Sequence, residues 1–328
     1  MLSGCFRDDV KEPALPEIFD QINTSAQIDQ VFYSLKNRRI VASNSMFDWD
    51  LAFACEKGKF SIKLNAAKSM RAYNTFSREI DIDYTYLINQ SYALNWTYEH
   101  PGMTEGGCLG KWGDFSFENP QSYGHVYIID RGFNLYLNGL RYPPKKMRVD
   151  GFGSNSYKVT FSDINGDNMT QVVVPKNNTH NYVYIELDYG STRAIEPPKD
   201  EWDILFTPYI DSVGIMNSIP ALDSTAPGLA LYDGILINPH ARSAAMVANS
   251  ALADIDFFTV DGLNFSSKLN SIGNQWLIGS GILNRNINPE KQSFVIQDNE
   301  RNSYALQLLN FKKLPNKHSE LEFSFKNL

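Results

Sequence analysis

A five-residue pattern that occurs twice constrains the fold of this chain more than any other feature. The two copies are WDLAF (49–53) and WDILF (202–206), which share the frame Trp-Asp-aliphatic-x-Phe. Each copy follows an aromatic run, a polar turn and a returning run, in VFYSLKNRRIVA (31–42) and in VYIELDYGSTRAIE (183–196). The sequence therefore predicts a unit of one hairpin and one following strand that the chain contains twice.

The alternation of side chains along a strand offers a physical reason for this frame. Alternate side chains share a face, so the indole, aliphatic and phenyl groups of each copy would form one apolar row for the core. The aspartate would point to the other face, where its carboxylate can cap a turn or accept backbone N–H groups. These residues are therefore predicted to be structural and not catalytic: Trp49, Asp50, Phe53, Trp202, Asp203 and Phe206.

Strand signals dominate the remainder of the chain. The sequence contains 17 Tyr and 20 Phe, residue types that favour pleated, half-buried surfaces. Residues 59–65 alternate apolar and polar side chains, and residues 293–325 form a probable meander of three strands. Helical periodicity is scarce, with its best example at 242–258. We predict an all-β, mostly antiparallel fold with few short helices.

The repeat also predicts how the chain is organised. Residues 1–28 contain acidic residues and prolines, as expected of a solvated tether. Residues 29–179 would form the first β unit, and residues 180–328 the second β unit with the C-terminal meander. Whether the two related units share one core is left open by the sequence.

The first residues, MLSGC, have the form of a bacterial lipobox. In such a motif small residues precede a cysteine that is lipidated, so Cys5 is predicted to carry a lipid anchor. No basic stretch and apolar core precede the motif, and an ordinary disordered start with a free thiol is the alternative. The acidic run after Cys5 resembles the export signal of surface lipoproteins of Bacteroidetes. We therefore expect an outer-membrane, surface-exposed protein that contacts the membrane only through this lipid.

Charge and motifs exclude several classes of function. The net charge of −7 and the pI of about 5.3 leave no basic stripe for phosphates, so no nucleic-acid partner is predicted. The GxSxG, HExxH, Walker and GxGxxG patterns are absent. We predict that the chain is not an enzyme, with a hydrolase that uses two unrecognised carboxylates as a remote alternative.

Two further patterns have an ordinary structural interpretation. Cys55 and Cys108 match neither zinc nor CxxC spacing and are predicted to be buried thiols, with a disulfide as the alternative. DINGDNMT (163–170) resembles the start of a calcium loop, but its glycine comes too early and the final glutamate is missing. A hairpin turn around Asn165 and Gly166 is predicted instead.

Several short segments follow one another in a recognisable order along the chain. They are FSIKLN (60–65), YIIDRG (127–132), EPPKDEWDILFTPY (196–209), ILINPH (235–240) and YALQLLNF (304–311). Their order resembles the HmuY-like lipoproteins of Bacteroidetes, over most of residues 29–326. The resemblance implies a β-rich protein that binds haem between two axial His or Met side chains and delivers it to a TonB-dependent outer-membrane receptor. This chain resembles a longer branch, with additional material at 100–180 and 211–290.

The resemblance makes haem the preferred ligand, and four residues are candidates to hold it. His100 and Met103 lie in a Gly- and Pro-containing loop, His125 opens a strand, and His240 follows one. His100 or Met103 together with His125 is the best pair of axial ligands, although each histidine alone is more typical of a hydrogen-bonded surface residue. The alternative function is an accessory surface lipoprotein of the same fold that binds a partner protein or another ligand, without haem or catalysis.

Overall fold

The computed structural model confirms that the chain is mostly antiparallel β with few short helices. Cys5 and the lipobox lie outside the residues that the structure describes, as does most of the tether predicted at 1–28. The tether prediction is wrong for the described part of that stretch, because Ile18–Asn23 form strand β1, which pairs with β25 (Ser319–Asn327) and buries Ile22 in the core. The described residues are 16–23, 29–90, 93–103, 107–116, 120–134, 140–212, 228–240, 242–278, 286–298, 300–313 and 319–328.

Four antiparallel sheets carry most of the described residues, and we number them I to IV. Sheet I contains β1 (Ile18–Asn23), β25 (Ser319–Asn327), β24 (Ser303–Lys313), β23 (Ser293–Asp298) and β20 (Arg242–Val247). Sheet II contains β19 (Leu229–Ile237), β18 (Ile204–Ser212), β2 (Asp29–Ser34) and β3 (Arg39–Ser45). Sheet III contains β17 (Thr192–Arg193), β16 (Tyr182–Ile185), β4 (Leu51–Ala54) and β5 (Ile62–Leu64). Sheet IV contains β15 (Thr170–Pro175), β14 (Ser156–Asp163), β13 (Lys145–Phe152), β10 (Val126–Asp130), β6 (Arg71–Asn74) and β7 (Thr97–Tyr98).

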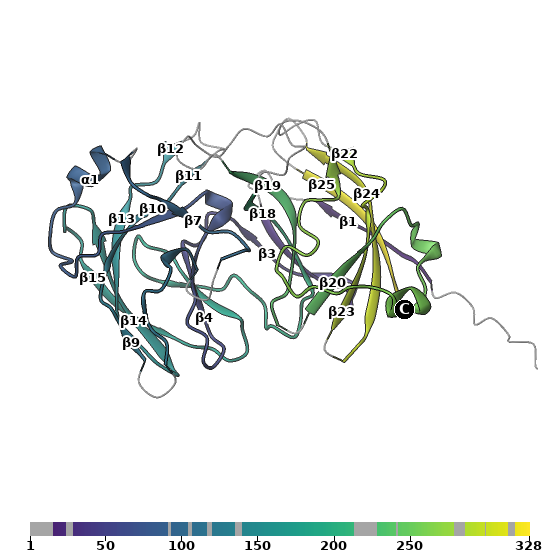
Figure 1. Ribbon diagram of the computed structural model, residues 1–328, viewed down its shortest axis with the longest axis horizontal. Helices are drawn as coiled ribbons and strands as arrows, with labels where there is room; N and C mark the ends of the chain where they lie inside the picture. The colour runs from purple at the N-terminus through teal and green to yellow at the C-terminus, as the bar shows by residue number, and fades with distance from the viewer. Residues whose placement is uncertain are drawn as a thin grey trace, which may run out of the picture.

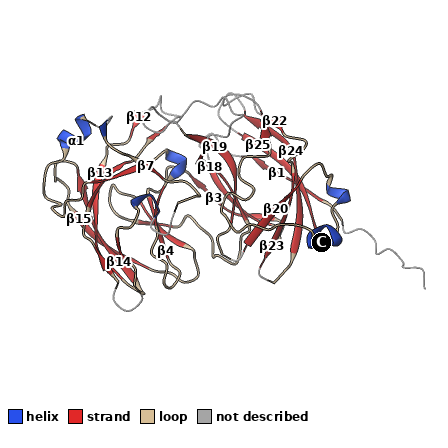
Figure 2. Ribbon diagram, viewed as in Figure 1, coloured by secondary structure: helices blue, strands red, loops and turns tan. Residues whose placement is uncertain are grey.

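Short strand pairs and the helices lie in the connections between the strands of these sheets (Figure 2). The two-residue pairs are β8 (Gly113–Asp114) with β9 (Gln121–Ser122), β11 (Phe133–Asn134) with β12 (Leu140–Arg141), and β21 (Leu277–Ile278) with β22 (Asn286–Ile287). The helices are α1 (Thr85–Asn89), α2 (Phe257–Asp261) and the 3₁₀ turns η1 (Ala66–Lys68), η3 (Gly107–Leu109) and η4 (Leu252–Asp254).

The four sheets follow one another along the long axis of the molecule in the order IV, III, II, I (Figure 1). The largest apolar clusters fill the space between sheets I and II and the space between sheets III and IV, so each pair is a β-sandwich. A smaller aromatic cluster joins sheets II and III back to back. The chain enters through sheet I, crosses II and III to IV, and returns through III and II to I.

The two copies of the repeat exchange their parts. Strand β4 of the first copy pairs with β16 of the second, with Leu51 opposite Ile185. Strand β18 of the second copy pairs with β2 of the first, with Ile204 opposite Tyr33. Sheets II and III are therefore each built from the hairpin of one copy and the Trp-Asp strand of the other. The hydrogen-bonded sheets cross residue 180, so the predicted units 29–179 and 180–328 are not two separate bodies.

Several local predictions are confirmed. Residues 29–45 form the hairpin β2–β3, residues 156–175 form the hairpin β14–β15 around the predicted turn, and β23, β24 and β25 form the C-terminal meander. Cys55 and Cys108 are buried free thiols.

The helix predicted at 242–258 is wrong. Its first residues form β20, which pairs with β23 along its whole length, and a turn at Asn249 with φ of 55° ends the strand. Further along this stretch the chain forms the one-turn η4 at Leu252–Asp254, and Phe257 and Phe258 begin the short helix α2, whose N-terminus Asp256 caps. Pairing within the sheet therefore overrides the weak helical periodicity.

The tryptophans of the repeat do not share a face with the phenylalanines, contrary to the prediction. Strands β4 and β18 begin at Leu51 and Ile204, two residues after each tryptophan, so strand alternation does not extend to the indoles. Phe53 lies in the core between sheets III and IV and Phe206 in the core between I and II. Both indoles lie instead in the aromatic layer between sheets II and III.

The aspartates of the repeat anchor the chain where it passes between these two sheets. Asp50 accepts the backbone N–H of Leu187 at 2.8 Å, and Asp203 accepts that of Leu35 at 2.7 Å, which confirms the predicted role of both carboxylates. In each case the N–H belongs to the hairpin of the other copy. The other carboxylate oxygen of Asp203 pairs with the Arg242 guanidinium at 2.7 Å.

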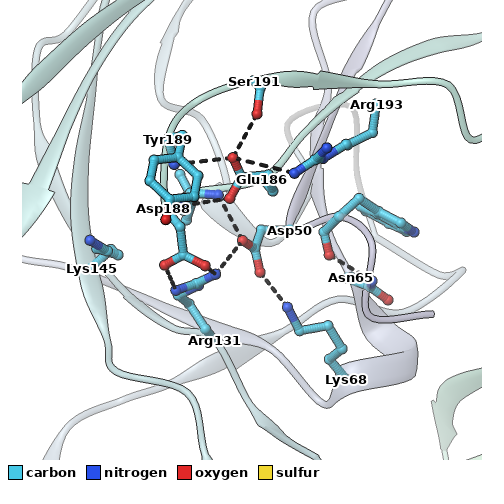
Figure 3. A network of polar contacts seen from close by, with 12 residues as sticks. Asp50, Asn65, Lys68, Arg131, Lys145, Glu186, Asp188, Tyr189, Ser191 and Arg193 are labelled. Carbon is cyan, nitrogen blue, oxygen red and sulfur yellow. Dashed lines mark hydrogen bonds and ion pairs between the residues drawn. The ribbon is translucent and has the colours of Figure 1, made fainter. Parts of the chain in front are cut away.

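The Asp50 anchor is part of a larger buried network (Figure 3). Asp50 pairs with Lys68 and, at 2.8 Å, with Arg131. The Arg131 guanidinium also donates two hydrogen bonds to Asp188, at 2.6 and 3.0 Å. Burial alone would raise the pKa of Asp50, but Lys68 and Arg131 hold it below its ordinary value, so the carboxylate is ionised. This arrangement ties η1, sheet III and the end of β10 together.

Replacing Asp50 with Ala is expected to destabilise the protein by about 3–5 kcal/mol, because it leaves Lys68 and Arg131 buried without their shared carboxylate. Urea unfolding followed by circular dichroism measures this change. Asp254→Ala is the matched control, since Asp254 is exposed, and it should stay within about 0.5 kcal/mol of wild type. Equal stability of the two variants would contradict the anchor role.

Candidate functional site

A cavity of about 120 Å³ lies between sheets II and III, where the two copies of the repeat face each other. Equivalent positions of the copies meet there: Trp49 with Trp202, and Tyr184 with Phe32. Eight half-buried residues line its rim, whereas both indoles are almost fully buried. The rim residues are Lys63, Ala66, His100, Pro101, Tyr182, Leu205, Leu236 and Leu269.

Two edge-to-face aromatic pairs form the inner wall. The rings of Trp49 and Tyr184 have centroids 4.9 Å apart, and those of Trp202 and Phe32 are 5.0 Å apart. Each indole N–H is already bonded within the protein, Trp49 to Gln30 at 2.7 Å and Trp202 to Glu196 at 3.3 Å. The indoles therefore offer a ligand apolar contact and not hydrogen bonds.

Glu196 is the buried carboxyl group of this wall. It accepts hydrogen bonds from the Asn181 amide, the Tyr182 backbone N–H at 3.0 Å and the Trp202 indole. Burial raises the pKa of Glu196 to about 7, and these three donors only partly oppose that effect. Glu196 therefore changes its charge near neutral pH.

A second carboxyl group, Glu99, lies beside the amino group of Lys63. Glu99 accepts the backbone N–H groups of Cys108 at 3.1 Å and Leu64 at 3.4 Å, and burial raises its pKa. The Lys63 ammonium lies 4.7 Å from the ring centroid of Tyr182. Burial opposes the charge of Lys63, but Tyr182 and Glu99 raise its pKa above the ordinary value. The cavity thus combines one cation with two carboxyl groups.

His100 is the one predicted haem-ligand candidate that lines this cavity. Its Nδ1 accepts the backbone N–H of Gly102 at 3.2 Å. In the neutral imidazole the proton is then on Nε2, which is left to donate a hydrogen bond.

The other three candidates lie elsewhere. Met103 is half-buried and packs against the core between sheets III and IV. His125 lies 3.2 Å from the Asn74 amide and contacts the exposed ring of Phe76. His240 lies 3.3 Å from the Asp200 carboxylate and does not line the cavity.

The structure separates His125 from the cavity that His100 lines. Strand β7, which precedes His100, pairs with β6 at Arg71, whereas His125 is beside Asn74 at the other end of β6. Among the described residues that line the cavity, neither Met103 nor His125 occurs. The pairing of His100 or Met103 with His125 as axial ligands stays a prediction.

The residues that the sequence prediction missed belong to a longer form of the repeat. IKLN (62–65) and ILIN (235–238) occupy equivalent strands, β5 and β19. The amide of Asn65 donates to the Trp49 carbonyl at 3.0 Å, and that of Asn238 donates to the Trp202 carbonyl at 2.7 Å. Aligning these two tetrapeptides would have located Lys63, which lines the cavity opposite Leu236. No comparable signal exists for Glu99 and Glu196.

No group of three or more metal-ligating side chains occurs among the described residues. In the same part of the chain, no helix is long and apolar enough to cross a membrane. A second cavity of about 50 Å³, between sheets I and II near Trp276, is smaller and mostly apolar.

Comparison of the chain with protein-family models, curated proteins and solved structures found no match.

The raised pKa of Glu196 predicts a pH-dependent stability. An unfolded glutamate titrates near 4.5, so between about pH 4.5 and 7 the folded protein holds a proton that the unfolded chain has lost. The free energy of unfolding should fall as the pH rises through this window, by up to about 3 kcal/mol at about 1.4 kcal/mol per pKa unit. Glu196→Gln should remove most of this dependence.

Urea unfolding at pH 5 and pH 8 measures the effect. Glu201→Gln, at an exposed position nearby, should keep the dependence of the wild type. If Glu196→Gln and wild type lose the same stability between the two pH values, Glu196 does not titrate in this window.

Proposed function

We propose that this chain is a non-catalytic binding protein that captures one compact ligand between sheets II and III. The observation that carries the proposal is the concentration of aromatic walls and buried ionisable side chains around one cavity. Ligand sites are typically apolar concavities with a few convergent polar groups, some with perturbed pKa values. This corresponds to the alternative function that the sequence allows, a ligand-binding surface protein without haem.

The chemistry of the two carboxyl groups favours binding over hydrolysis. A glycosidase that uses two carboxyl groups needs one that is protonated and one that is ionised, and their environments differ accordingly. Burial raises the pKa of both Glu99 and Glu196, so their environments do not separate these roles. Among the described residues that line the cavity, no Ser, Cys or His nucleophile has a partnering base.

Haem is the second candidate ligand, and the observation in its favour is the imidazole of His100 at the rim. The fit is poor in two respects. Among the described residues that line the cavity, His100 is the only histidine, and neither Met nor Cys accompanies it. The cavity volume of about 120 Å³ is below the roughly 150 Å³ of an engineered cavity that holds one benzene. A porphyrin has several such rings, so most of it would lie outside the cavity.

The sequence is the basis for including an outer-membrane location in the proposal. Lipidation of Cys5 would tether the chain to the outer membrane, and a TonB-dependent receptor is the expected partner for transfer of a captured ligand. The HmuY-like resemblance is the basis for both expectations.

Blocking the rim tests the binding site. Ala66→Trp places a large side chain at a half-buried rim position, and it should abolish ligand signals by filling the cavity. Saturation-transfer NMR with a pool of methyl glycosides, cyclohexanol, benzylammonium and benzoate measures binding. At least one compound should respond with wild type and lose its signal with Ala66→Trp. Val173→Trp, on the exposed edge strand β15, is the control and should bind as wild type.

A haem titration tests haem as the alternative ligand. At equimolar haem, we expect the wild type and the variant His100→Ala to give the same Soret spectrum. A shift that His100→Ala abolishes and His240→Ala retains would contradict our preference for a compact ligand and would favour haem. If no compound in the pool gives a signal with wild type or with Ala66→Trp, the proposed binding function is wrong.

The lipid anchor is tested separately. Cys5→Ala, expressed with a complete lipoprotein leader, should lose incorporation of radiolabelled palmitate and should leave the membrane fraction. Cys55→Ala is the control, because Cys55 is a buried thiol and should not affect labelling. Labelling of the Cys5→Ala variant would show that the lipobox assignment is wrong.

A further inference from the structure

We infer that the cavity between sheets II and III binds one sugar ring, as a free monosaccharide or as the terminal unit of a glycan. This inference rests on the proposed function and names the class of ligand. Three properties of the site point to it: the size of the cavity, its apolar walls, and the mixture of hydrogen-bonding groups that surrounds it.

The size of the cavity limits the ligand to one ring. Its volume of about 120 Å³ is close to the roughly 150 Å³ that hold a benzene molecule in an engineered apolar cavity. A single six-membered ring is of this size. Hydroxyl groups on that ring, or a linkage to a second sugar, would extend through the rim, where the lining residues are only half-buried.

The walls fit a ring with one apolar face. Trp49 and Trp202 contribute indoles whose N–H groups are already bonded to Gln30 and Glu196. Their remaining contact surface is aromatic carbon, and the C–H face of a sugar ring is the apolar part of that molecule. Contact between these two apolar surfaces would exclude water from both and would be favourable.

The charges in the cavity favour a neutral polar ligand. The Lys63 ammonium would repel a cationic ligand, and the carboxyl groups of Glu99 and Glu196 would repel an anion once ionised. A hydroxyl group both donates and accepts hydrogen bonds. It can therefore donate to a carboxylate and accept from Lys63 or from Nε2 of His100. Several hydroxyls on one ring satisfy this mixed set without adding charge.

Isothermal titration of the full chain tests the ligand class. The probes are the methyl glycosides of glucose, galactose, mannose and N-acetylglucosamine, with cyclohexanol, benzylammonium and benzoate for comparison. At least one glycoside should bind saturably with a Kd on the order of 1 mM or tighter. Cyclohexanol, with the same ring but one hydroxyl, should bind at least about tenfold more weakly. Lactose, maltose and chitobiose then distinguish a glycan terminus from a free monosaccharide.

The variant His100→Ala should weaken glycoside binding about fivefold by removing one donor, whereas His240→Ala should leave it unchanged. Both histidines are half-buried loop residues, so both variants are expected to fold, and circular dichroism verifies this. If no glycoside binds, or if benzylammonium or benzoate binds more tightly than every glycoside, the sugar assignment is overturned. In that second case the cavity still binds a ligand, and the proposed function survives.

Discussion

The structure depends on how the chain is held where it passes between sheets II and III. At both crossings an aspartate of the repeat binds a backbone N–H of the hairpin from the other copy, Asp50 at Leu187 and Asp203 at Leu35. A buried cation neutralises each carboxylate, which burial would otherwise disfavour. These contacts fix the register of both inner sheets. Each inner sheet in turn presents one face to an outer sheet and the other to its counterpart.

The cavity follows from this arrangement. Two inner sheets of related sequence meet back to back through their aromatic residues, and equivalent residues such as Trp49 and Trp202 face the same space. Where the copies differ, the space becomes polar on one side, because Lys63 corresponds to Leu236 and Tyr182 corresponds to Gln30. The aromatic positions that the copies share thus supply the apolar walls, and positions at which they differ supply part of the polar lining that a ligand site requires.

The sequence predicted correctly those features that residues close together in the chain determine. Alternation in 59–65 and the polar turn at 163–170 identified strands and a hairpin correctly, since neighbouring residues determine both. The predicted apolar row of the repeat is wrong, because both indoles precede their strands. They pack between sheets II and III and not in the cores that contain Phe53 and Phe206. The sequence could not place His125 relative to the cavity, because positions in loops do not indicate which end of β6 each residue lies beside.

The sequence by itself determined the class of fold, the positions of most strands and the backbone-binding role of Asp50 and Asp203, because these follow from local patterns of apolar, turn and acidic residues. Only the tertiary structure decided that the two copies exchange strands, and that Glu99 and Glu196 converge on one cavity. Contacts between segments more than 100 residues apart depend on which sheet edges pair. Burial of a carboxyl group depends on what packs around it, and a single sequence encodes neither in a local pattern.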